Sequence, residues 1–181
     1  MRIDDNEMEK LMQEALDHGF SHVGKVEVST LKPMNEVRSM CAAGKCNAYG
    51  KNWMCPPACG TVEECTERIR QFDNGLLLQV TGQLEDDFDA EAIMEAGARL
   101  KTLAESFADK LRKSYDKVML LSAGACAICK KCAYPEPCRF PDKATSAMEG
   151  YALLVTQVCA ANGMKYYYGP QTITYHAVVL F

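Results

Sequence analysis

Residues 75–82 have the sequence GLLLQVTG, and residues 118–123 have the sequence VMLLSA. Each is a short apolar run of the length typical of a buried strand. Between them, residues 89–116 repeat apolar side chains at helical spacing, on a stripe formed by Ile93, Leu100, Leu103, Phe107 and Leu111. A strand, a long amphipathic helix and a second strand in succession predict an α/β fold.

The remaining elements follow from helix caps and from apolar periodicity on either side of this unit. Before the unit, the sequence predicts a helix from Asp5 to Asp17 that Gly19 ends, a strand at HVGKVEVS (residues 22–29), an irregular stretch at residues 30–60, and a helix from the Thr61/Glu64 capping box to about Phe72. After the unit, it predicts a helix that a Ser146/Glu149 capping box opens and that Asn162 and Gly163 close. Two strands around a Gly-Pro turn are predicted at residues 165–181.

Composition and charge exclude several classes of protein. A chain of 181 residues can bury an adequate core as one domain, so it needs no disulfide staples. The acidic start MRIDDNEMEK lacks the apolar segment of a signal peptide, and no apolar run is long enough to span a bilayer. A net charge of −4 argues against a nucleic-acid partner. We therefore expect a cytoplasmic protein whose 10 cysteines remain free thiols, available to a metal.

The segment GACAICKKCAYPEPCRFP, residues 124–141, holds the spacing Cys126-x2-Cys129-x2-Cys132-x5-Cys138. Thiolates at successive intervals of three residues can wrap a polynuclear cluster, as in the ferredoxin run C-x2-C-x2-C-x3-C-P. A single tetrahedral zinc is usually held by two separated pairs, which this run does not resemble. The spacing therefore favours an iron–sulfur cluster, with zinc as the alternative. The longer last gap leaves open whether Cys138 binds this cluster or a neighbouring one.

A second group of cysteines lies in CAAGKCNAYGKNWMCPPACGTVEEC, residues 41–65. Cys65 falls on the apolar stripe of a predicted helix, and Cys159 falls in another apolar run, so both are interpreted as core residues. Either Cys59 or Cys65 could be the fourth ligand here, and we favour Cys59. Eight candidate ligands remain, in two sets of four, the ligand count of two [4Fe–4S] clusters. They are Cys41, Cys46, Cys55, Cys59, Cys126, Cys129, Cys132 and Cys138.

We expect a mostly parallel or mixed sheet of four to five strands flanked by helices, in a single domain over residues 1–181 that carries two cysteine-rich metal-binding loops. The first three or four strands are expected to run mostly parallel. Each cysteine-rich segment follows a strand, and the ends of parallel strands lie along one rim of a sheet. The two segments are therefore predicted to be neighbours.

CNAYGKNWMCPP (residues 46–57) and GACAICKKCAYPEPCRFPDKATSAMEGYA (residues 124–152) together resemble an uncharacterised family of predicted metal-binding proteins. The resemblance covers most of the chain and is most specific at YGKxWxCPP, at CxxCxxC-x5-CRxP and at the Ser-x-Met-Glu step that begins with Ser146. It implies metal binding through the cysteines of these motifs, and it implies no particular activity. The matching residues are Cys46, Cys55, Cys126, Cys129, Cys132 and Cys138.

Polar and aromatic residues near the cysteines have simpler interpretations. Ser146 and Glu149 are spaced as a capping box rather than as a nucleophile and a base. Arg139 could bind an anionic partner, offset a negatively charged cluster or form a surface salt bridge. Trp53, close to Cys55, could shield a cluster from water. The three histidines are expected to be structural.

The sequence predicts an iron–sulfur protein with two [4Fe–4S] clusters that carries single electrons to or from a redox partner protein. Two alternatives remain. Zinc or a structural cluster could order the loops of a protein-interaction module, or an enzyme could use a cluster with one iron open to substrate, most simply near Cys59. Whether the protein is an enzyme stays open.

Overall fold

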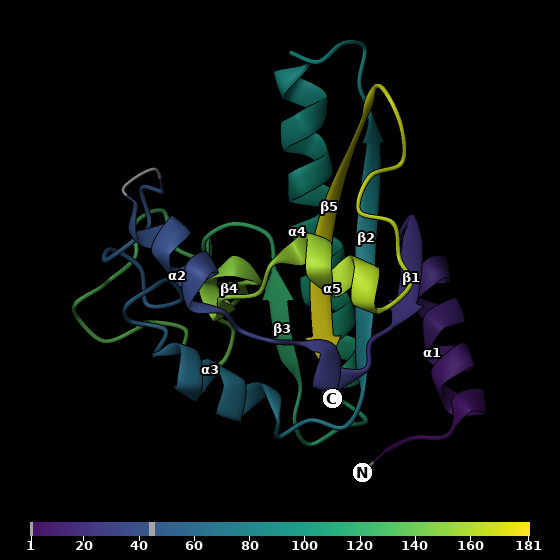
Figure 1. The fold of residues 1–181 in the computed structure, drawn as a ribbon, viewed down its shortest axis with the longest axis horizontal. Coiled ribbons are helices and arrows are strands. Elements are labelled where there is room, and N and C mark those ends of the chain that lie inside the picture. The colour runs from purple at the N-terminus through teal and green to yellow at the C-terminus, as the bar shows by residue number, and fades with distance from the viewer. Residues whose placement is uncertain (1, 44–45) are drawn as a thin grey trace.

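A five-stranded sheet with helices on both faces forms the centre of the protein (Figure 1). The computed structural model describes residues 2–43 and 46–181. The strands are β1 (His22–Lys25), β2 (Gly75–Gln83), β3 (Met119–Ser122), β4 (Ser146–Ala147) and β5 (Thr172–Leu180). The helices are α1 (Asp5–His18), α2 (Asn35–Ala42), α3 (Val62–Ile69), α4 (Ala90–Leu111) and α5 (Val155–Ala161), with 3-10 turns η1 (Val28–Thr30) and η2 (Glu149–Tyr151).

The strands lie in the order β1-β2-β5-β3-β4. β5 pairs antiparallel with both β2 and β3, β1 pairs antiparallel with β2, and β4 pairs parallel with β3. The prediction of an α/β protein with a mixed sheet flanked by helices is therefore confirmed. β2 and β3 run in the same direction, as a strand–helix–strand crossover requires. The expectation of parallel strands is wrong for β1, which runs opposite to β3.

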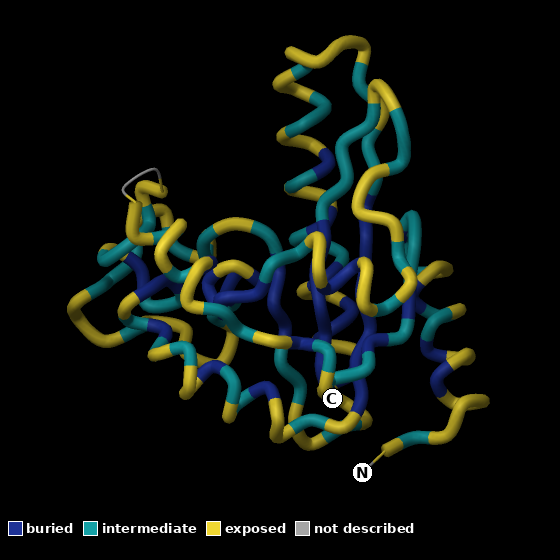
Figure 2. Tube along the Cα trace, viewed as in Figure 1, coloured by how far each residue is buried: buried dark blue, intermediate teal, exposed yellow. Residues whose placement is uncertain are grey.

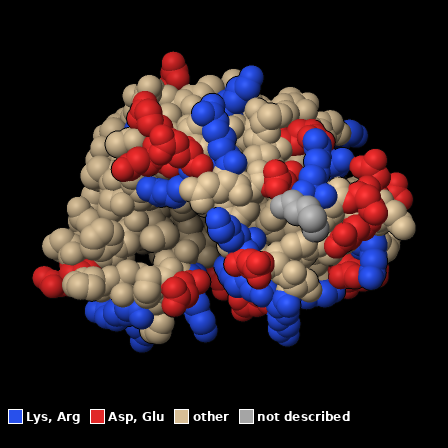
Figure 3. Space-filling model, turned by 90° about the horizontal axis from the view of Figure 1, so that it is seen from below, with Lys and Arg blue, Asp and Glu red and all other residues tan. Residues whose placement is uncertain are grey.

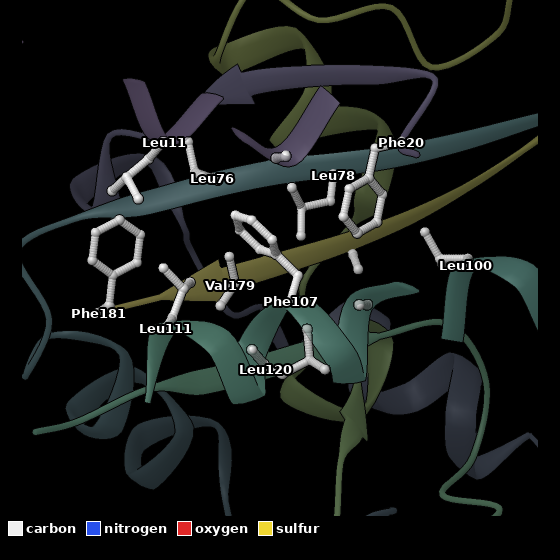
Figure 4. Packing of buried hydrophobic residues seen from close by; sticks show 14 of the residues in the cluster. Leu11, Phe20, Leu76, Leu78, Leu100, Phe107, Leu111, Leu120, Val179 and Phe181 are labelled. Carbon is white, nitrogen blue, oxygen red and sulfur yellow. The ribbon is translucent and has the colours of Figure 1, made fainter. Parts of the chain in front are cut away.

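Each face of the sheet buries its own hydrophobic cluster, because successive side chains of a strand point to opposite faces. On β2, Leu76 and Leu78 join the cluster that α1 and α4 cover, which Figure 4 shows around Phe107. Leu77 joins the cluster on the other face, beneath α3 and α5. Figure 2 shows this arrangement as a buried centre with exposed helix surfaces and loops around it.

Two of the predicted helix ends are confirmed. Asp4 caps the start of α1, and Gly19 ends the helix in the left-handed conformation (φ 113°) that favours glycine. The Thr61/Glu64 capping box opens α3, with both reciprocal hydrogen bonds present. Local signals therefore fix these ends, although α3 is shorter than predicted.

The prediction of a helix opened by Ser146 is wrong. Ser146 lies in β4, and its hydroxyl donates to the carbonyl of Met54 (2.7 Å) instead of capping a helix. Ala152 then adopts a left-handed conformation (φ 59°) that separates η2 from α5. The predicted strand pair at the C-terminus is a single strand, β5. The stretch predicted to be irregular contains α2, of which only Val37 is buried.

No helix among the described residues is long and apolar enough to cross a membrane. Acidic and basic side chains are interspersed over the face of the molecule in Figure 3, which is the face seen from below.

Candidate metal centre

The two cysteine-rich segments lie together at one side of the molecule, beyond β3 and β4 (Figure 1). The side chain of Asn52 donates to the carbonyl of Cys126 (3.1 Å), and the indole of Trp53 donates to the carbonyl of Glu136 (2.7 Å). The ring of Trp53 also meets the ring of Tyr134 edge-on, with centroids 5.0 Å apart. The predicted proximity of the two segments is therefore correct.

The predicted reason for that proximity, a shared rim of parallel strands, is wrong. β1 and β3 run in opposite directions, so their C-terminal ends lie at opposite ends of the sheet. After β1 the chain instead crosses the sheet and reaches α2 on the far side (Figure 1). The amide of Met34, just before α2, donates to the carbonyl of Ala152 (2.8 Å), which holds the crossing in place. The crossing, and not a shared rim of parallel strands, carries the first cysteine segment to the second.

All four cysteines of the second segment line one cavity. Asn52, Trp53 and Met54 of the first segment line it as well, so both segments form its wall. The residues of the second segment around the cavity are Cys126, Ile128, Cys129, Cys132, Ala133, Cys138, Arg139, Phe140 and Ala144. The four thiols of the C-x2-C-x2-C-x5-C run therefore face one space, and their donor chemistry suits a cluster, although their sulfurs are not in ligating positions here.

Backbone amides favour the thiolate of Cys132. Desolvation alone would raise the pKa of this thiol, but hydrogen bonds from the backbone of Tyr134 and Trp53 outweigh it and lower the pKa. The charge of Arg139 acts in the same direction. Because the thiolate is the form that binds metals, the loop geometry around Cys132 prepares it as a ligand.

The four proposed ligands of the first segment are close enough to repel one another as thiolates. Burial raises the pKa of Cys55 to about 12, and the charges of Cys46, Cys59 and Cys41 raise it in the same direction. Cys126 of the second segment also contributes, so the two sets adjoin. A bound cation is what would offset such mutual repulsion.

The 3-10 turn η2 contacts both ends of the first set. The thiol of Cys59 contacts the carbonyl of Gly150 (3.2 Å), and that of Cys41 contacts the carbonyl of Glu149 (3.8 Å). Cys55 and Cys59 are buried, Cys41 is half-buried and Cys46 is exposed.

Within residues 2–43 and 46–181, no three His, Cys, Asp or Glu side chains are arranged so that they could hold a metal ion.

Arg38 of α2 is a residue of this site that the sequence did not reveal. Its guanidinium donates to the sulfur of Cys59 through Nη1 (3.4 Å) and to the sulfur of Cys65 through Nη2 (3.6 Å). Hydrogen bonds from Cys65 and Arg38 lower the pKa of Cys59 against the effect of burial. Because the sequence predicted an irregular stretch in place of α2, nothing indicated that Arg38 and Cys41 share a helix.

The two cysteines interpreted as core residues are buried. Cys65 is 0% exposed and Cys159 is 1% exposed, and both belong to the cluster beneath α3 and α5. Cys159 accepts a hydrogen bond from Gln79 (3.8 Å) and lies apart from the cysteine-rich segments. Cys65 differs, because its contacts with Arg38 and with the carbonyl of Cys59 place it at the border of the first set.

The three histidines have neighbours elsewhere in the fold. His18 bonds Ser106 (3.1 Å), and the ring of His22 stacks on the ring of Tyr168 (3.8 Å between centroids). His176 is buried in β5 against the ring of Tyr166. These contacts agree with the structural roles predicted for them.

The family model described as "Predicted metal-binding protein (DUF2284)" matches residues 24–181. The chain belongs to this family. The match confirms the resemblance drawn from the CPP and CxxCxxC-x5-CRxP motifs, and it includes both cysteine-rich segments. No curated protein and no solved structure matches the chain.

Proposed function

We propose that this DUF2284 protein binds two [4Fe–4S] clusters and carries single electrons. The observation that carries the proposal is the arrangement of eight cysteines in two adjoining sets. One set lines a single cavity, and in the other Cys41, Cys46 and Cys59 lie within electrostatic reach of Cys55. The C-x2-C-x2-C spacing favours a cluster over a mononuclear zinc site.

The proposed ligands of the first centre are Cys41, Cys46, Cys55 and Cys59, and those of the second are Cys126, Cys129, Cys132 and Cys138. Cys138 lines the same cavity as the other three, which supports ligation of its own centre rather than the first. When bound, a [4Fe–4S] cluster accepts or donates one electron at a time. The protein orders the thiolates, donates backbone hydrogen bonds to them and limits access of water, and these factors set the potential.

Trp53 is the residue that most directly joins the two centres. It lines the cavity of the second set, lies in the segment of the first set and bonds the loop at Glu136. A large half-buried ring at this place would keep water from the second centre. The role proposed for Trp53 is therefore shielding, together with fixing the loop.

The surface around the second set suits a redox partner protein. Ile128 and Phe140 line the cavity and are 37% and 46% exposed, while Lys130, Lys131 and Arg139 are exposed nearby. Exposed apolar residues rimmed by charge mark interaction sites more often than isolated ones do. A cytoplasmic location is part of the same proposal, because thiolate ligands persist in a reducing compartment.

Metal and sulfide analysis of protein purified without oxygen tests this function. We expect about eight irons and about eight acid-labile sulfides per chain, as two cubanes require. Stoichiometric zinc without sulfide would contradict the electron-carrier function and favour the zinc-ordered interaction module. About four irons would indicate that only one set is a cluster site.

A further inference from the structure

The guanidinium of Arg38 is half-buried and donates to sulfur atoms rather than to a carboxylate. Among the residues that the structure describes, no carboxylate forms an ion pair with Arg38. Its Nη1 and Nη2 atoms point at the sulfurs of Cys59 and Cys65, and its buried Nε atom has no hydrogen-bond partner. Partial burial of a charge costs free energy unless an opposite charge offsets it, and the sulfurs of Cys59 and Cys65 are the groups placed to supply that charge.

The position of Arg38 on α2 places it beside the first set of cysteines. Arg38 and Cys41 are three residues apart on one helix, a spacing that puts two side chains on the same face. Arg38 also bonds Cys59, so it approaches two of the four proposed ligands of the first centre. Four thiolates would give a [4Fe–4S] centre a net negative charge, which the positive charge of Arg38 would offset.

We propose that Arg38 raises the reduction potential of the first centre, an inference that rests on the proposed function. Reduction adds one electron to the cluster and no proton, and Arg38 keeps its positive charge throughout, so the negative charge beside it grows by one. A fixed cation stabilises the more negative state more strongly, and hydrogen bonds to the ligand sulfurs act in the same direction. Arg38 is a tuning residue, because it acts through Cys59 and does not bind the metal.

The second centre has a different set of charges. Arg139, whose charge acts on Cys132, is exposed, and Lys101 donates to the carbonyl of Ala125 rather than to a cysteine sulfur. Solvent screens an exposed charge more than a half-buried one. Substitution of Arg38 should therefore shift the reduction potential of the first centre and not that of the second. The potential of the second centre, measured in the same molecule, is the reference for the first.

The test is a redox titration of the anaerobic protein with dithionite, followed by electron paramagnetic resonance. Cys55→Ala and Cys129→Ala, which each remove one centre, assign the signals. In Arg38→Gln we expect the reduction potential of the first centre to fall. At a fixed solution potential, the ratio of its reduced to its oxidised form should drop at least tenfold, which is equivalent to 59 mV for one electron. Arg38→Lys keeps the charge and should shift the potential less.

Lys51→Gln is the matched control, because it removes one positive charge from the same segment at an exposed position. It should leave both potentials nearly unchanged, and none of the three variants should move the potential of the second centre. An unchanged first centre in Arg38→Gln would overturn the inference, as would equal shifts of both centres. Loss of the first centre in Arg38→Lys would also overturn it, since the site would then need the shape of arginine rather than its charge. Zinc without sulfide in the wild type would contradict the proposed function before any potential is measured.

Discussion

Cys59 and Cys65 are both buried thiols beside Arg38, and their other contacts distinguish them. Cys59 contacts η2 and is an electrostatic neighbour of both Cys41 and Cys55. Cys65 faces the apolar cluster beneath α3 and α5. These contacts support Cys59 as the fourth ligand of the first set and Cys65 as a packing residue that borders it.

Replacing each of these two cysteines by alanine separates the roles. Cys59→Ala should lose about four irons per chain, because a cubane of the proposed kind needs four thiolates. Cys65→Ala should keep its full metal content and lose about 1–2 kcal/mol of stability, mainly from the small cavity left in the core. Metal analysis and urea unfolding of both variants, with Cys159→Ala as a second core control, provide the measurements. If Cys65→Ala loses iron while Cys59→Ala does not, the assignment of the fourth ligand is wrong.

At the level of helices and strands, the predictable features were those that local sequence determines. β2 and α4 carry apolar side chains at the periods of a buried strand and an amphipathic helix. β2 and the start of α4 were each predicted to within one residue, but α4 ends at Leu111, before the predicted end at residue 116. The caps of α1 and α3 are local as well. By contrast, α2 buries only Val37 and therefore has no apolar stripe to detect.

The direction of β1 and the central place of β5 depend on tertiary contacts. β5 is the last strand in the chain but inserts between β2 and β3, where its alternating side chains fill both apolar clusters. The sequence of β5 alone does not indicate which strands flank it in the sheet. Ser146 fails as a cap for the same reason, because its partner, the carbonyl of Met54, is 92 residues away in the chain.

The buried histidine of β5 makes the stability of the fold depend on pH. His176 is 4% exposed, neither ring nitrogen has a hydrogen-bond partner, and burial lowers its pKa to about 4. The unfolded chain, with an ordinary pKa near 6.5, then binds the proton more readily than the folded protein does. Stability from this residue is therefore complete above about pH 6.5 and falls as the pH drops toward 4, by up to roughly 3 kcal/mol.

His176→Phe should remove this dependence, because the ring then carries no titrating group. We expect the variant to match or exceed the wild type at pH 5, since no hydrogen bond is lost, and to differ little at pH 7.5. Urea unfolding of both proteins at several pH values provides the comparison, and acid effects on the cysteine sites cancel in the difference. A constant difference between the two proteins from pH 7.5 to pH 5 would show that His176 is not held in its neutral form.

At the scale of the whole molecule, membership of a predicted metal-binding family was predictable from the sequence, and the assembly of the candidate site was not. Cysteine number and spacing indicated two sets of ligands and a metal-binding protein, because those features are contained within each segment. The contacts that bring the sets together involve residues far apart in the chain, such as Asn52 with Cys126 and Trp53 with Glu136. Arg38 was missed because its function depends on the same assembly.

The contacts between the two cysteine-rich segments place the two proposed centres close to each other. Cys126 is among the electrostatic neighbours of Cys55, and the side chains of Asn52 and Trp53 bridge the segments by direct hydrogen bonds. Two clusters held this close should interact magnetically, so the paramagnetic spectrum of the fully reduced protein should be broadened and split. Partial reduction should give the simpler signal of one centre, and Cys129→Ala should give the unsplit signal of the first centre at every potential that reduces it. If the fully reduced wild type instead shows two sharp and independent signals, the bound centres lie farther apart than the contacts between Trp53 and the second loop imply.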